Sequence, residues 1–144
     1  MKNIHFWVKW LFITCLIVIA YGLGLVFFSQ SALFDLLIND RINMTFWGTT
    51  RVTPDILTFQ SFIYSVLGAT AAGWGILLAF MVQYPFRNKE KWAWNAIALA
   101  IATWFVLDTG YSVYYQAYIN AIINTILLVA LGLPLLVTRK EFMK

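Results

Sequence analysis

The sequence predicts an all-α, polytopic membrane protein: a four-transmembrane-helix bundle with a short amphipathic helix in the first external loop. Hydrophobic residues make up 62% of the 144 residues and charged residues only 11%. A soluble domain carries roughly 25% charged residues, so this composition lies well outside the soluble range. The chain also contains four apolar runs, each at least as long as the roughly 20 residues that a helix needs to cross a bilayer. At this length we expect a single domain, residues 1–144.

The first two spans are expected at about residues 6–28 and 54–84. The first contains Lys9 only near its start, where a lysine side chain can reach the membrane interface. Its apolar run exceeds the roughly 7 to 15 residues of a signal peptide, so we expect a retained span. In the second span, Thr53 is the expected N-cap, and Pro54 takes the first helical position, where its missing N–H costs nothing.

The third and fourth spans are expected at about residues 91–115 and 118–138. Only a few residues connect them, and such a short connection requires antiparallel neighbours. We therefore expect a tight helical hairpin. Pro134 predicts a kink in the fourth span near its cytoplasmic end.

Residues 29–53 are the only sizeable segment expected outside the membrane. In the stretch "SALFDLLINDRI", Leu33, Leu36 and Leu37 recur at helical spacing behind Ser31, which suits a helix cap. We expect a short amphipathic helix that lies on the outer surface or folds over the bundle. The following residues 43–53, "NMTFWGTTRVT", are expected to be loop.

Lysine and arginine residues beside the spans predict the orientation. Eight fall on one side, and Arg41 and Arg51 on the other; the eight are Lys2, Lys9, Arg87, Lys89, Lys91, Arg139, Lys140 and Lys144. By the positive-inside rule both termini are cytoplasmic, and we expect a multi-pass protein of a bacterial inner membrane. An inner aromatic belt is expected from Trp7, Trp10, Trp92 and Trp94.

The net charge of +4 indicates topology and not a nucleic-acid partner, because the basic residues lie in short clusters beside apolar runs. The expected partner is the lipid bilayer itself. A lipid-like ligand, another membrane protein or further copies of this chain are the other candidates.

The stretch "WFVLDTGYSV" contains Asp-Thr-Gly, the loop signature of aspartic proteases, at Asp108. Such a protease needs two carboxylates that share a proton, each on a loop that leaves a β-sheet. Here the tripeptide lies in a predicted helix, and the chain has no second copy of it. The sequence therefore does not indicate a protease.

Asp108 lies seven residues before Tyr115, so about 10 Å below the outer end of the third span. A charged aspartate at the centre of a membrane helix costs about 2.5 to 3.5 kcal/mol on insertion scales, so it needs polar partners. Polar side chains are expected at the same depth on other spans or one turn away: Tyr21, Gln60, Tyr64, Ser112, Asn120 and Asn124. We expect them to line an outward-facing polar pocket, with Asp108 at its base and the loop helix as its roof.

The lower part of span two carries small residues on one stripe. Gly68, Ala72 and Gly75 follow Gln60 and Tyr64 along that stripe. Small residues at this spacing let transmembrane helices approach closely, so we expect them to pack against another span.

Asp108 also has two alternative roles. In a structural role, a protonated Asp108 hydrogen-bonds to Asn124 or a tyrosine and holds the hairpin together; in the other, it contacts a partner protein. The only candidate cationic partners are Arg41 and Arg51 of the external loop, since no Lys, Arg or His lies inside the membrane at its depth.

Other chemistry is sparse. The single Cys15 can form no intrachain disulfide, which excludes the disulfide-oxidising membrane enzymes that need cysteine pairs. The single His5 has no cysteine or histidine companion, so no metal site or cofactor is expected. One intramembrane acid without a nucleophile and base gives no enzymatic mechanism.

Three functions of different class remain open. The first is a membrane protein whose pocket binds a lipid-like or cationic amphipathic small molecule, which predicts a cavity open to the outer leaflet. The second is an accessory or assembly subunit of a larger membrane complex, which predicts a solid bundle with Asp108 structural. The third is an oligomeric small-molecule transporter.

The plan of four spans with a long loop after the first resembles the emopamil-binding and sigma-2-receptor group of sterol- and lipid-handling proteins. The resemblance is one of architecture, and no functional residues are carried over.

Overall fold

The computed structural model describes residues 4–143, which form helices and turns and contain no strand. Four helices are long and apolar enough to cross a membrane: α1 (Ile4–Phe28), α4 (Pro54–Met81), α5 (Lys91–Tyr114) and α6 (Tyr118–Phe142). The all-helical class and the number of long apolar helices are therefore confirmed. Shorter helical segments are α2 (Ala32–Phe34), η1 (Asp35–Asn39), α3 (Asp40–Trp47) and η2 (Val82–Phe86).

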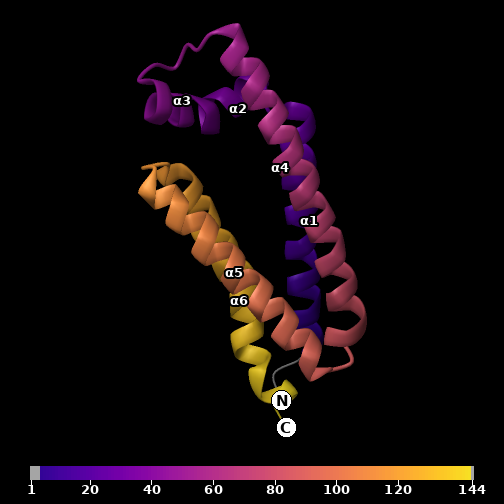
Figure 1. Ribbon diagram of the computed structural model, residues 1–144. Helices are drawn as coiled ribbons and strands as arrows, with labels where there is room; N and C mark the ends of the chain where they lie inside the picture. Colours follow the sequence, from indigo (N-terminus) through magenta and orange to yellow (C-terminus); the bar gives the residue numbers. More distant parts are fainter. Residues whose placement is uncertain (1–3, 144) are drawn as a thin grey trace.

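The long helices form two antiparallel pairs, α1 with α4 and α5 with α6 (Figure 1). The pairs meet at the end of the molecule where α1 begins and α6 finishes, and they diverge toward the other end, which α2 and α3 cover (Figure 1). We call these the terminal end and the loop end. Because the pairs touch mainly at one end, the described chain is an open bundle and not a parallel-sided one.

The apolar core lies at the terminal end, where all four long helices contribute to it. Leu11 of α1, Phe86 of η2, Ile97 of α5 and Leu131 of α6 are almost completely buried there. The rings of Phe86 and Phe142 lie 4.6 Å apart. This close packing of large side chains holds the two helix pairs together, since the interior of a protein is stabilised by dense van der Waals contact.

The α1/α4 pair is closely packed because both helices carry glycine at their crossing. A Cβ atom at Gly68 would lie 2.4 Å from the carbonyl oxygen of Gly22, and a Cβ at Gly22 would lie 2.5 Å from that of Gly68. Ala72 and Gly75 continue the contact, and both are buried against α1. The small-residue stripe of α4 therefore faces α1, where backbone meets backbone.

Two tryptophans donate to the backbone of α6 around its proline. Pro134 has no N–H, so the carbonyl of Ala130, one turn earlier, lacks its usual intrahelical donor. The indole Nε1 of Trp10 lies 2.9 Å from that oxygen, and Nε1 of Trp94 lies 3.0 Å from the carbonyl of Leu135. Two members of the expected aromatic belt thus join α1 and α5 to α6.

The segment at the loop end differs from the prediction. Ser31 caps α2 as expected, with its Oγ accepting from the N–H of Phe34 at 3.3 Å. The expectation that residues 43–53 are loop is wrong for 43–47, because α3 continues to Trp47. The helix ends only where Gly48 adopts a left-handed backbone, with φ of +67°, and donates its N–H to Met44. The signal that ends this helix is the glycine and not Asn43.

Thr53 and Pro54 also lie where the sequence placed them, before and at the start of α4, but the Thr53 side chain makes no capping hydrogen bond. Beyond Met81 the same helix continues as the π-helical turn η2, which includes Pro85. The long apolar helix 54–86 is therefore interrupted in its hydrogen-bond register near the terminal end.

Candidate functional site

Helix α5 presents three polar side chains on one face near the loop end. Trp104, Asp108 and Ser112 follow one another at intervals of four residues, which places them along one side of a helix. The α5–α6 turn ends with Ala117, and Asn120 follows in the first turn of α6. This tight turn brings Asn120 back to the level of Asp108.

Asp108 lies at the centre of a hydrogen-bonded cluster. Its Oδ1 accepts from Nδ2 of Asn120 at 2.7 Å, and its Oδ2 accepts from Nε1 of Trp104 at 3.2 Å. The Ser112 hydroxyl lies 2.6 Å from the backbone oxygen of Asp108 and 3.3 Å from Oδ1 of Asp108. Because a hydroxyl has a single proton, Ser112 donates chiefly to the nearer backbone oxygen. The second N–H of Asn120 reaches the Ser112 oxygen at 2.8 Å.

The carboxylate retains capacity to accept further hydrogen bonds. A carboxylate offers about four lone-pair positions, and here Asn120 and Trp104 supply its two principal donors. Asp108 forms no ion pair within residues 4–143. Neither Arg41 nor Arg51 pins the loop to it: the Arg41 guanidinium donates instead to the carbonyls of Leu36 and Leu37, at 2.9 and 2.7 Å.

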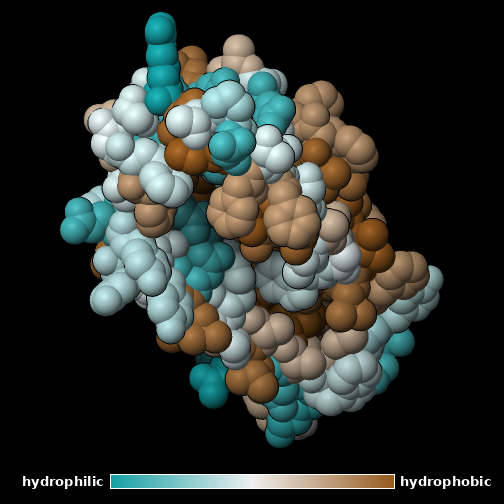
Figure 2. All heavy atoms as spheres, turned by 45° about the horizontal axis from the view of Figure 1, so that its top comes forward, coloured by the Kyte–Doolittle hydropathy of each residue, from teal (hydrophilic) through white to brown (hydrophobic). Residues whose placement is uncertain are grey.

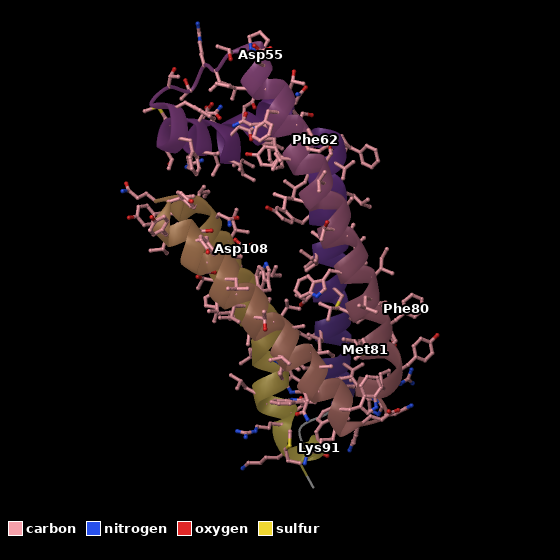
Figure 3. The ribbon with its side chains drawn as sticks, in the orientation of Figure 1. Asp55, Phe62, Phe80, Met81, Lys91 and Asp108 are labelled. Atoms are coloured by element: carbon pink, nitrogen blue, oxygen red, sulfur yellow. The ribbon has the colours of Figure 1, made fainter. Side chains whose placement is uncertain are left out.

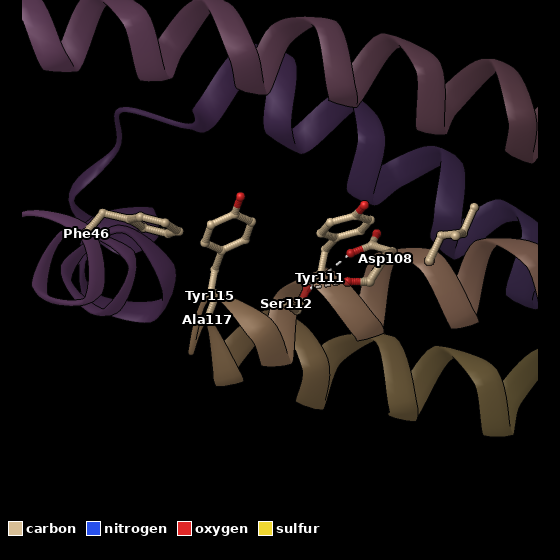
Figure 4. A pocket seen from close by; sticks show the side chains of 7 residues that line it. Phe46, Asp108, Tyr111, Ser112, Tyr115 and Ala117 are labelled. Carbon is tan, nitrogen blue, oxygen red and sulfur yellow. Dashed lines mark hydrogen bonds between the residues drawn. The ribbon is translucent and has the colours of Figure 1, made fainter.

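A cavity of about 370 Å³ opens beside this cluster. Its lining combines Asp108 and Ser112 with the aromatic rings of Phe46, Tyr111 and Tyr115, together with Leu107 and Ala117. Figure 4 shows the Asp108, Tyr111 and Tyr115 side chains pointing from α5 toward the side on which α1 and α4 lie. Phe46 comes from α3, and its ring centre lies 6.2 Å from that of Tyr115. The cavity is thus bounded by the loop segment at one end and Asp108 at the other.

Below the cluster, two indoles connect α4 with α5. The rings of Trp74 and Trp104 lie 5.8 Å apart. Trp104 therefore both contacts the opposite helix pair and donates to Asp108. Trp104 was not among the expected site residues, although its spacing of four residues from Asp108 on a helix was a usable signal.

The structure brings only some of the expected site residues together. Asp108, Ser112 and Asn120 form the cluster, whereas Tyr21 of α1 makes no hydrogen bond to it among the described residues. Asn124 does not bond Asp108; it lies one turn deeper, where its Nδ2 donates to Oγ1 of Thr109 at 3.3 Å. No tyrosine hydroxyl bonds Asp108 among the described residues, so the partner proposed for a structural aspartate is Asn120 and not Asn124 or a tyrosine.

Gln60 and Tyr64 lie higher, beneath the loop segment. Gln60 donates to Oδ1 of Asn43 and so attaches α4 to α3. The ring of Tyr64 packs 6.0 Å from Phe34, and its buried hydroxyl has no hydrogen-bond partner among the described residues. These two side chains contribute to the roof and not to the Asp108 cluster.

The surface of the loop end mixes two kinds of residue. Figure 2, which looks obliquely onto this end, shows hydrophilic residues gathered on the left and apolar residues on the right. Tyr111 and Tyr115 remain 63% and 54% exposed, so the aromatic wall of the cavity is open to whatever surrounds the protein. These rings and Phe46 were not predicted as pocket residues, since aromatic residues near a helix end first indicate a membrane interface.

A carboxylate beside exposed aromatic rings suits a cation. The carboxylate supplies negative charge, and the face of an aromatic ring attracts a cation electrostatically. Among residues 4–143, no lysine or arginine side chain takes that place. No family model, curated protein or solved structure matches this chain.

Proposed function

We propose that this protein is a multi-pass membrane protein whose loop end lies outside the cytoplasm and binds an amphipathic cation. The terminal end carries Lys9, Arg87, Lys89, Lys91, Arg139 and Lys140, which favours a cytoplasmic location for that end and for both termini. With this orientation the Asp108 cavity opens near the outer membrane interface. Figure 3 places Asp108 on α5 below the loop segment.

The observation that carries the proposal is the free acceptor capacity of Asp108 in an aromatic cavity. Two donors leave lone pairs of the carboxylate available, and no cation of the described chain occupies the space. An ammonium group between the carboxylate and the rings of Tyr111 and Tyr115 would satisfy both. The apolar part of such a ligand would lie against Leu107, at the end of the cavity away from the loop segment and nearer the hydrocarbon of the bilayer.

Native mass spectrometry tests this proposal. The wild-type protein in neutral detergent is titrated with decylammonium, whose N–H groups can donate to the carboxylate, and Asp108→Asn is titrated beside it. We expect Asp108→Asn to weaken binding at least tenfold, since a hydrogen bond to a charged group contributes about 1.5 to 3 kcal/mol. The same spectra record any small molecule that copurifies with wild type and is lost in Asp108→Asn.

Asp55→Asn is the matched control. Asp55 is an exposed carboxylate at the start of α4, also at the loop end (Figure 3) and outside the cavity. It should leave binding unchanged. Equal binding by wild type and Asp108→Asn, or equal binding of neutral decanol and the cation, would rule the proposal out.

A second candidate is an accessory subunit of a larger membrane complex. The observation that favours it is the outer face of α5, the least buried of the four long helices. Leu99 and Val106 on this face are 70% and 67% exposed. A partner helix could cover this face, and the Asp108 cluster would then serve to fix the α5/α6 hairpin. A stable, stoichiometric complex that is broken by Leu99→Gln, but not by Asp108→Asn, would favour this role over ligand binding.

An oligomeric transporter ranks third. A transport pathway needs polar groups through both halves of the membrane, whereas the terminal end of this chain is filled by an apolar core. Leu11, Phe86, Ile97 and Leu131 close the space between the helix pairs there.

A further inference from the structure

A second cavity lies in the groove between α1 and α4 on the terminal half of the molecule. Its volume is about 460 Å³. Phe12, Leu16 and Ile19 of α1 and Ile76, Ala79 and Phe80 of α4 make its apolar walls. Phe80 points away from α5 and α6 (Figure 3), so this groove lies on a face distinct from that of the Asp108 cavity.

The groove becomes polar at its end nearest the connection to α5. There it is lined by Gln83, Tyr84 and Arg87. The π-helical turn η2 sets the position of this polar group: the N–H of Arg87 bonds the carbonyl of Val82, five residues back, at 3.2 Å. Turns of this kind change the direction in which side chains point and are frequent at functional sites.

Arg87 is available for an external anion. The ion pair formed at this end within residues 4–143 is between Lys89 and Glu141, at 2.9 Å, and it does not involve Arg87. The rings of Phe80 and Tyr84 stack at 6.0 Å and form a ridge beside the groove. An arginine at the mouth of an apolar groove offers a forked donor that matches a phosphate group.

The length of the groove indicates what occupies it. Ile76 and Arg87 are eleven residues apart, which on a helix is about 16 Å. This is about half of the roughly 30 Å hydrocarbon thickness of a bilayer. The groove therefore has the length of one leaflet, with a cationic group at the level of the lipid headgroups.

We propose that the groove is a binding site for an anionic phospholipid of the leaflet at the terminal end. The phosphate lies at Arg87, with Gln83 and Tyr84 beside it, and one acyl chain runs along the wall formed by Phe80 and Ile76. The basic residues of this end attract anionic lipid, and Arg87 holds it in one place. This site does not depend on the function of Asp108.

The test compares phosphatidylglycerol with phosphatidylcholine of the same acyl chains, each added to the purified protein in neutral detergent and scored by native mass spectrometry. Wild type should retain phosphatidylglycerol about tenfold better. Arg87→Gln should abolish this preference. Arg139→Gln makes the same charge change at the same end, outside the groove, and should keep it. Ile76→Trp fills the apolar part and should reduce retention of both lipids.

Ile76 and Arg87 are both exposed, so neither change should affect folding, and the melting temperature of each variant is measured to verify this. Equal retention of the two lipids by wild type would overturn the proposal. So would equal loss of preference in Arg87→Gln and Arg139→Gln, because it would show a diffuse attraction to the basic end. Unchanged retention in Ile76→Trp would show that the acyl chain does not lie in this groove.

Discussion

The terminal half and the loop half of this molecule are built from the same four helices but are held together differently. In the terminal half, large apolar side chains from all four helices interlock, and polar groups are few. In the loop half the two helix pairs diverge, and the two helices of each pair are held together by contacts of their own. Backbone contact at Gly22 and Gly68 joins α1 to α4, whereas the Asp108 cluster joins α5 to α6.

This difference shows where a ligand can bind without unfolding the protein. A closely packed core cannot accommodate a ligand, because opening it would lose van der Waals contacts. In the loop half, where the pairs diverge, a cavity lies between α5 and the Phe46 ring of α3. The polar residues of the spans follow this division, since Asp108, Ser112 and Asn120 all lie in the open half.

The largest expected effect comes from removing a ring in the closed half. Phe86 is completely buried, whereas Phe62 in the open half is 63% exposed. We expect Phe86→Ala to lower the free energy of unfolding by about 3 kcal/mol, because it leaves a cavity in the core. Phe62→Ala should change it by less than about 0.5 kcal/mol. Unfolding in mixed detergent micelles measures both, and equal effects would remove the distinction between the halves.

An intermediate effect is expected where α1 meets α4. In Gly68→Ala, the added methyl meets the backbone oxygen of Gly22, so the helices must move apart at a cost of about 1 to 3 kcal/mol. Gly73 lies on the same helix with nothing within 4 Å of an added Cβ. Gly73→Ala should therefore stabilise the helix by up to about 1 kcal/mol. Effects of opposite sign in the same unfolding assay are the expected result, and destabilisation by both would contradict it.

The smallest effect on the free energy of unfolding is expected from a change in the Asp108 cluster. Asn120→Ala removes a donor from both Asp108 and Ser112, but hydrogen bonds between membrane helices contribute only about 0.6 kcal/mol on average. Asn95, exposed on α5, makes no side-chain hydrogen bond among the described residues, so Asn95→Ala serves as control. A loss of several kcal/mol in Asn120→Ala would mean that the cluster is primarily structural and would weaken the case for a ligand site.

Several features of the site could be predicted because they are local. Asp108 and Ser112 are one turn apart on a single helix, and a hairpin as short as that between α5 and α6 returns the chain to the same depth. The choice between Asn120 and Asn124 could not be made in this way. Both lie on one face of α6, one turn or about 5.4 Å apart. Which of them reaches Asp108 is decided by how α6 packs against α5.

The roof of the cavity shows a second limit. Gln60 has the depth expected for a pocket residue, but it bonds Asn43 of α3. That pairing depends on how far α3 extends, which Gly48 determines, and on how the loop folds back over the bundle. Trp104 was missed because an indole in a membrane helix indicates an apolar contact as readily as a hydrogen-bond donor.

The sequence alone determined the four long apolar helices, their approximate ends and the small-residue face of α4, because hydrophobic length and residue size act along one helix at a time. It also determined the charge asymmetry between the two ends. Only the tertiary structure decided that α1 pairs with α4, that the pairs diverge toward the loop end, and that aromatic rings from α3 and α5 meet beside Asp108. Those features depend on contacts between segments far apart in the chain, and helical periodicity carries no information about which faces meet.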